Sequence, residues 1–232
     1  MIHRTLLATA ALTVFGAAAQ GQAIIGGQVG LAYDRNITHG ASRATVGGSL
    51  DLGLMDGLTL QADLAGHSRS AATDSVATGA HLIYDLGSQA AVGGFLTYEN
   101  WSGNFHDYDY GIEGRFSTRG ATPLTVEGYL MRVARNQGRS DFNGFGLDAA
   151  LDVSDRSSIR AGYFAANGSA DLKRFSFGLS YDLSPSLVFG LNAARVNAPG
   201  HHDNVVGLSI DYKFGAGALV GRRGLGDMVR GF

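Results

Sequence analysis

The chain has 232 residues, no cysteine, 45% hydrophobic residues and a formal net charge of −2. The near balance of charge excludes a strongly basic nucleic-acid-binding surface and a disordered polyanion, and the absence of cysteine excludes a framework of disulfides. After the first 23 residues no long uninterrupted apolar run remains, which excludes transmembrane helices.

Residues 1–23 have the pattern of a cleaved secretory signal peptide. Arg4 supplies a positive start, residues 6–19 are apolar, and small residues at 17–19 offer a cleavage site near residue 19 or 23. A membrane-anchoring helix is the weaker alternative, because a spanning helix needs ~20 apolar residues. We therefore expect the chain to be exported.

From residue 26 onward, apolar and polar residues alternate in segments of ~10 residues, the length of a tilted transmembrane strand. Successive side chains of a strand point to opposite faces. In segment 205–214 one face is apolar and ends in two aromatic residues: Val206, Leu208, Ile210, Tyr212 and Phe214. Similar strands are expected at 26–35, 44–54, 58–67, 76–86, 90–99, 108–117, 124–135, 145–153, 159–166, 174–183 and 187–197.

A soluble sheet would bury such apolar faces in a core, but the repetition exceeds what one soluble core absorbs. The pattern instead predicts an all-β protein, a closed antiparallel transmembrane β-barrel of about 12 strands, with 10 or 14 possible. Its outer face contacts lipid and its inner face contacts water. Arg132 is a misfit on the outer face, which a snorkelling side chain or a β-bulge would explain.

The connections between these strands alternate in kind. Those near 55, 87, 120, 155 and 185 are short, whereas those near 36–43, 68–75, 100–107, 136–143, 167–172 and 198–203 are longer and polar. Outer-membrane barrels have short periplasmic turns and longer external loops. An even strand number then places both ends of the barrel domain, residues 24–214, in the periplasm.

The tail at 215–232 lacks alternation. Its six glycines disfavour a helix, so we expect a disordered periplasmic tail. Leu225, Met228, Val229 and Phe232 have helix-like spacing. The alternative is therefore an interfacial helix on anionic lipid, or a segment that enters the barrel mouth.

The inner face is the expected location of function. It carries many small residues, so a barrel of this size should keep a narrow wet lumen; alternatively, the glycines serve strand curvature alone. Near the turn end, five aspartates and one arginine have inward parity and form a predicted charge girdle: Asp51, Asp85, Arg115, Asp152, Asp182 and Asp211. Such a ring favours cations, unless each aspartate only pairs with a neighbour or caps a turn.

Catalytic, cofactor and metal sites are not expected. The histidine candidates are His67 beside Ser68, His81, His106, and the run His201, His202 and Asp203. A hydrolase needs a nucleophile, an oriented base and an oxyanion site in reach of one another, and no motif supplies the set. Two adjacent histidines point apart on an extended chain, which argues against a metal site.

The segment 205–214 resembles the closing strand of bacterial outer-membrane barrels, in which a terminal aromatic after alternating apolar residues is read by the assembly machinery. The assembly-signal residues would be Leu208, Ile210, Tyr212 and Phe214, although 18 residues follow Phe214. The opening at 26–33, G-G-Q-V-G-L-A-Y, is similar to that of porins.

The mature chain thus resembles the Gram-negative porin-like outer-membrane barrels. The resemblance implies an outer-membrane location, contact with its lipid and with the barrel-assembly machinery, and passive diffusion of small hydrophilic solutes. No loop is long enough to match the constricting loop of large porins. A non-channel structural or adhesive barrel that acts through its external loops is the alternative, and an outer-membrane lipid hydrolase is less well supported.

Overall fold

The computed structural model describes residues 23–228 except 104, 137 and 169. The predicted signal peptide up to residue 22 and the last residues of the tail, Val229 and Phe232 among them, lie outside the described residues.

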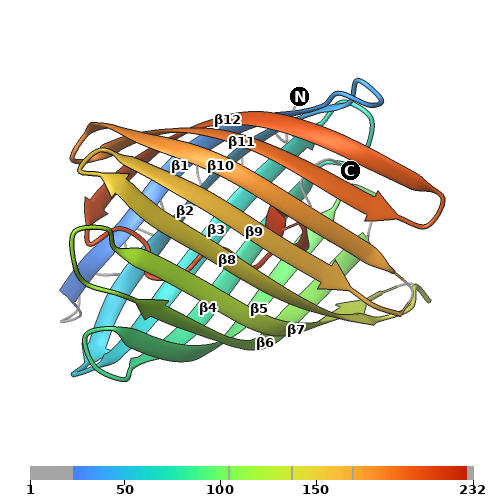
Figure 1. Ribbon diagram of the computed structural model, residues 1–232. Coiled ribbons are helices and arrows are strands. Elements are labelled where there is room, and N and C mark those ends of the chain that lie inside the picture. The colour runs from blue at the N-terminus through green and yellow to red at the C-terminus, as the bar shows by residue number, and fades with distance from the viewer. Residues whose placement is uncertain (1–22, 104, 137, 169, 229–232) are drawn as a thin grey trace, which may run out of the picture.

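The described chain forms twelve strands and one short helix, arranged as a barrel (Figure 1). They are β1 (Ala23–Asn36), β2 (Ser42–Met55), β3 (Leu58–Arg69), β4 (Ser75–Asp85), β5 (Ala90–Trp101), β6 (Phe105–Ser117), β7 (Leu124–Arg135), β8 (Phe142–Ser154), β9 (Ser157–Ala166), β10 (Leu172–Ser184), β11 (Leu187–Ala198), β12 (His201–Gly215) and α2 (Leu225–Met228).

Each strand pairs antiparallel with its neighbours in the chain, and β1 pairs with β12, so the sheet is closed. In this last pair Gly26 lies opposite Gly215 and Asn36 opposite Val205. Closure satisfies the backbone groups that an open edge would leave exposed to lipid. The predicted closed antiparallel barrel of twelve strands is confirmed.

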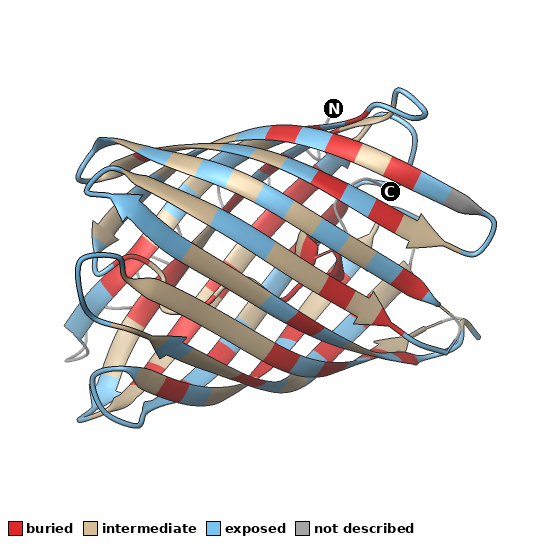
Figure 2. Cartoon of the chain, in the orientation of Figure 1, coloured by how far each residue is buried: buried red, intermediate tan, exposed pale blue. Residues whose placement is uncertain are grey.

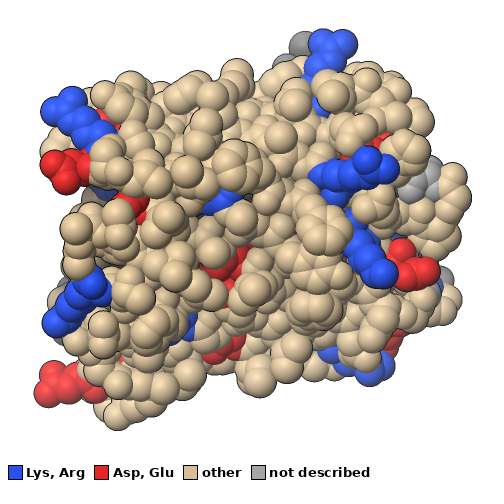
Figure 3. All heavy atoms as spheres, in the orientation of Figure 1, with Lys and Arg blue, Asp and Glu red and all other residues tan. Residues whose placement is uncertain are grey.

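The outer face is apolar and much of the inner face is polar, as the alternation predicts. Leu31 is 57% exposed and Ile112 63% on the outside, whereas Gln61 and His81 on the inside are fully buried. The alternation appears as bands of buried and exposed residues along the strands (Figure 2). In Figure 3 the charged side chains gather toward the two ends of the barrel, with only small charged areas between them. No helix within the described residues is long and apolar enough to span a membrane.

Arg132 lies on the outer face of β7 and bonds at the barrel rim. Its guanidinium is 2.9 Å from a carboxylate oxygen of Asp141 in the connection before β8. The pKa of Asp141 is lowered, first by the backbone N–H of Arg135 and then by Arg132. Arg132, the residue that does not fit the alternation, therefore belongs to an exposed ion pair at the end of the strand.

The difference in connection length that the sequence suggested is present but smaller than expected: four of the six connections at one end have five or six residues, and three of the five at the other end have two. The strands extend into the expected loops, so that only residues 199–200 connect β11 to β12 and residues 37–41 connect β1 to β2. At the opposite end, residues 118–123 form a connection as long as these or longer. We call the end that holds residues 37–41 and 199–200 the loop end, and the other the turn end. The orientation in the membrane stays a prediction.

Labelling of single cysteines tests this orientation. Ala71 and Ser88 are both exposed residues in hairpin connections, Ala71 at the loop end and Ser88 at the turn end. We expect an impermeant thiol reagent to label Ala71→Cys on intact cells and to label Ser88→Cys only after the outer membrane is opened. The chain has no cysteine of its own, so the background is low. Labelling of Ser88→Cys alone would reverse the orientation.

The tail differs from the expected disordered segment. Residues 218–228, which we call the luminal segment, lie inside the barrel, and Val220, Arg223 and Leu225 are buried there. The segment and its helix α2 are visible in red between the ribbons of Figure 1. Of the sequence-based alternatives, the described structure has the one in which the tail enters the barrel, because the inner wall supplies partners for its backbone.

Candidate functional site: the barrel lumen

The chain turns into the barrel immediately after β12. Gly215 and Gly217 have φ values of 58° and 78°, in the left-handed region that glycine adopts readily. A Cβ on Gly215 would lie 2.4 Å from the carbonyl oxygen of Ile25. The N–H of Ala216 donates to that same oxygen at 3.1 Å. The tail is thus fastened to the start of β1 and directed inward.

The inner wall binds the luminal segment through its backbone. Five amides donate to inward side chains: Leu219 to Asp51 (2.9 Å), Val220 to Gln61 (3.1 Å), Gly221 to Glu127 (3.0 Å), Leu225 to Asp109 (2.8 Å) and Gly226 to Glu99 (2.8 Å). Arg43 of β2 donates to the carbonyl of Gly226. A segment with little regular structure of its own thereby finds partners for many of its backbone groups inside the barrel.

Glycines on both sides make this close approach possible. A Cβ on Gly226 would lie 2.5 Å from Glu99 Oε1 and 2.8 Å from His67 Cδ2. A Cβ on Gly224 would lie 3.3 Å from Ala77 Cβ. On the wall, a Cβ on Gly47 would lie 3.1 Å from the guanidinium carbon of Arg222. Some of the small inward residues therefore make room for the segment rather than for water.

Arg223 connects the segment to a buried polar network. Its guanidinium donates to Glu113 and to Glu127, both at 2.9 Å, and lies over the ring of Tyr129 at 4.3 Å. Glu113 also contacts His81 Nδ1 at 2.5 Å, and His81 Nε2 contacts Asp63 at 2.9 Å. The arginine thus lies, largely buried, between carboxylates at the edge of the lumen, where charge interactions are stronger than in bulk water.

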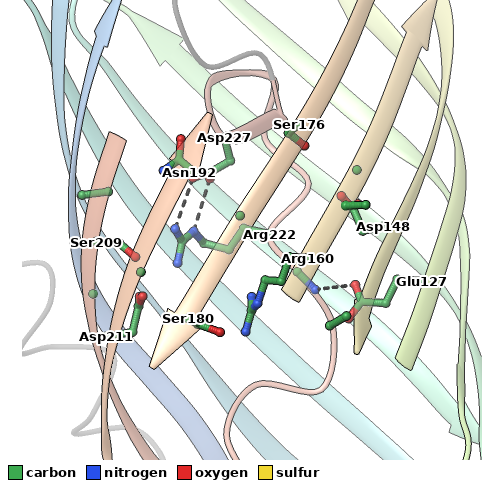
Figure 4. Close-up of a pocket in the computed structure, with 18 of the residues that line it drawn as sticks. Glu127, Asp148, Arg160, Ser176, Ser180, Asn192, Ser209, Asp211, Arg222 and Asp227 are labelled. Atoms are coloured by element: carbon green, nitrogen blue, oxygen red, sulfur yellow. Dashed lines mark hydrogen bonds and ion pairs between the residues drawn. The ribbon is translucent and has the colours of Figure 1, made fainter. Parts of the chain in front are cut away.

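A cavity of about 370 Å³, with both charged and apolar residues in its lining, remains beside the segment. Figure 4 shows side chains from several strands and from the segment pointing into it. Its charged lining includes five basic residues, Arg160, Arg174, Lys213, Arg222 and Arg223, and four acidic residues, Glu127, Asp148, Asp211 and Asp227. Arg222 bonds to Asp227 at 3.2 Å. We call this space the first cavity; its mixed charge and serine and asparagine groups suit water and small polar solutes.

A second cavity, of about 380 Å³, lies at the loop end. Its lining combines arginines with aromatic rings: the Arg69 guanidinium lies 4.6 Å from the ring of Trp101, and that of Arg135 lies 4.6 Å from the ring of Phe142. Leu225 of the luminal segment also lines it.

An apolar cluster inside the barrel, which we call the apolar layer, borders both cavities. Its buried members are Phe95, Tyr129, Met131, Val133, Phe142, Phe164, Ala166, Leu172, Val196, Leu225 and Met228. Phe164 lines both cavities, Met228 lines the first and Leu225 the second. The layer joins strand residues to the two apolar side chains that α2 contributes. The sequence pattern missed it because these strand residues sit among the polar inward positions.

The predicted girdle residues lie in different surroundings. Asp51 is fully buried and accepts a hydrogen bond from the N–H of Leu219, and Arg115 donates to the Leu219 carbonyl at 2.7 Å. Asp211 lines the first cavity. Asp85 and Asp152 are exposed, and Asp182 is half-buried. Two of the six therefore contact the luminal segment. A common action of the six on ions stays a prediction.

The histidine candidates also lie in different surroundings and do not form one site. His67 Nδ1 lies 3.1 Å from Thr45 Oγ1, His81 bridges two carboxylates, and His106 Nδ1 lies 2.9 Å from Asn136 Nδ2. Asp203 is buried and lies 3.1 Å from His39 Nε2, and His202 is exposed. Within the described residues no group of three or more His, Cys, Asp or Glu side chains could hold a metal ion.

Sequence reasoning missed Gln61, Glu99 and Asp109 as partners of the tail. A signal existed, because inward acidic residues concentrate on β2–β7 while the tail carries Arg222 and Arg223. That charge complementarity does not specify backbone amides as the main donors, because their positions depend on the tertiary structure.

Comparison with solved structures identifies the same architecture elsewhere. The NanC porin is similar with a TM-score of 0.63 and 9% identity, over 80% of this chain and 100% of that chain. The KdgM porin gives 0.62 and 11%, over 81% and 99%, and a further KdgM structure is a complex with disordered oligogalacturonate. The translocator domain of the autotransporter NalP from Neisseria meningitidis gives 0.55 and 14%, over 91% and 96%.

No protein-family model matches the chain, and no curated protein sequence matches it. At these identities the likeness to solved structures is one of fold. With its closed twelve-strand barrel, apolar outer face and polar lumen, the chain has the fold of the outer-membrane porins.

Proposed function

We propose that the protein is an outer-membrane channel for the passive diffusion of small hydrophilic solutes, without enzymatic activity. The observation that carries the proposal is the first cavity, whose lining includes nine charged residues and which lies inside a closed barrel with an apolar outer face. The porin neighbours support the same function and an outer-membrane location. In this role the chain contacts outer-membrane lipid, is exported by its first 23 residues and is inserted by the barrel-assembly machinery.

The alternative is a non-channel structural or adhesive barrel. The apolar layer is the observation that favours it, since the layer borders both cavities and fills part of the lumen with protein. Recording from the refolded full chain in a planar bilayer tests the proposal. We expect discrete openings from a state of low conductance. A barrel that never conducts, even when the luminal segment is displaced as described below, would be structural.

We further propose a mild cation preference. Asp182 and Asp211 are half-buried inward residues near the turn end, where carboxylates in a narrow space raise the local cation concentration. Arg160 and Lys213 line the same lumen and oppose the effect, so the preference should be small. Salt screens such charges over ~8 Å at physiological ionic strength, so concentrated salt should weaken it.

Reversal potentials test this preference. Under a salt gradient, the Asp182→Asn, Asp211→Asn double variant should lose most of the cation preference of the unaltered protein. Asp56→Asn is the matched control, because Asp56 is an exposed residue of the β2–β3 turn. An open channel whose reversal potential does not respond to the double substitution would show that these carboxylates have only a structural role.

A further inference from the structure

We propose that the luminal segment is the gate of the channel: it completes the apolar layer that closes the lumen, and its displacement connects the two cavities. The inference rests on the proposed channel function and adds to it a closing element and the contacts that hold it.

The closing element is the pair Leu225 and Met228 of α2. They are 8% and 5% exposed, and they pack in the same cluster as wall residues such as Phe164 and Val196, which are 1% and 0% exposed. A narrow constriction lined by apolar groups excludes water and thereby blocks ions without being sterically sealed. Because both residues come from the segment, the layer is complete only while the segment is in place.

The segment is held mainly from one side of the barrel. The acceptors of its five amides belong to β2, β3, β5, β6 and β7, while the first cavity lies mainly against β8–β12. Space is therefore present beside the segment, on the side opposite its acceptors.

The barrel wall does not depend on the segment for closure. β1 pairs with β12 directly, from Gly26 opposite Gly215 onward, and the segment begins after this pair. Residues 215–217 fasten its start to β1. Movement of residues 218–228 therefore leaves the hydrogen-bond ladder of the sheet intact, as a gate requires.

Gly226 is the position at which to displace the segment. Its hypothetical Cβ lies 2.5 Å from Glu99 Oε1 and 2.8 Å from His67 Cδ2, so Gly226→Leu cannot be accommodated without moving the segment or these two buried side chains. Gly128→Leu is the matched control. Gly128 is on β7, and its Cβ would make ordinary contacts at 3.7 and 3.9 Å, with Leu147 Cδ1 and the carbonyl oxygen of Gly146.

The experiment combines two readouts on the full chain in planar bilayers and proteoliposomes. The time-averaged conductance per channel of Gly226→Leu should rise by roughly an order of magnitude over the unaltered protein, as expected when an apolar constriction is absent for more of the time, while Gly128→Leu should not change it. In a Leu225→Cys background, a small water-soluble thiol reagent should react slowly with the otherwise unaltered protein and much faster after Gly226→Leu.

The two readouts distinguish the possible failures. Faster labelling of Leu225→Cys with unchanged conductance in a channel that conducts would mean that the segment moves but does not gate. Equal labelling and equal conductance in both proteins would also overturn the gate. If labelling is faster and no protein conducts at all, the channel function itself fails, and the gate with it.

Discussion

Phe214→Ala is expected to reduce strongly the amount of folded barrel in the outer membrane. The ring of Phe214 lies over Gly27 at the β1–β12 seam, where one ring carbon occupies space that a Cβ on Gly27 would need. Truncation of a buried phenylalanine costs about 3–5 kcal/mol, with the lower end appropriate to this partly buried ring. If the machinery also reads this aromatic, loss of the signal adds to the loss of the seam contact.

The measurement is the fraction of heat-modifiable, membrane-inserted protein. Phe116→Ala is the matched control, since Phe116 is an exposed outer-face aromatic near the turn end of β6, away from the seam. Deletion after Phe214 should still allow insertion, because the strand that closes the barrel is retained. Should this truncation abolish insertion while Phe214→Ala has no effect, the signal would lie in the tail.

The truncated barrel should nevertheless unfold more easily than the full chain. Asp51, Glu99 and Asp109 each accept a backbone N–H from the luminal segment, and deletion removes these donors. Buried groups that lose their hydrogen bonds cost about 1–3 kcal/mol each, unless water enters and solvates them. Insertion and stability are therefore separate readouts of the same deletion.

His81→Ala is expected to cause a large loss of stability. The ring is fully buried and bonds to Asp63 through Nε2 and to Glu113 through Nδ1. Its removal leaves two carboxylates without the group that separates them. Removing one partner from a buried charged network typically costs about 3–5 kcal/mol.

Urea unfolding in detergent measures this loss. His106→Ala is the control, because His106 is half-buried near the rim and its ring bonds to Asn136; it should change the free energy of unfolding by no more than about 1 kcal/mol. Equal effects of the two substitutions would contradict a central role of His81 in the network. Since Glu113 also holds Arg223, we expect His81→Ala to loosen the luminal segment as well.

The sequence by itself determined the barrel. Strand side chains alternate with a period of two, and lipid outside with polar groups inside imposes that period on every strand. Residues such as Leu31, Ile112 and Tyr212 therefore reveal their outer position locally, each from its immediate neighbours. The turn from β2 to β3 is also local, since Gly57 has the left-handed φ of 75° that the turn requires.

Only the tertiary structure decided what fills the barrel. The alternation predicts that Asp51, Glu99 and Asp109 point inward, but it does not predict whether water or protein contacts their carboxylates. Their partners are backbone amides within residues 219–226. Backbone amides are present in every sequence, so no residue pattern identifies these donors. The glycines that in the sequence predict a disordered tail allow it to lie against the wall, as at Gly226. A contact between distant segments of the chain depends on the shape of the closed barrel, and that shape exists only after the twelve strands have paired.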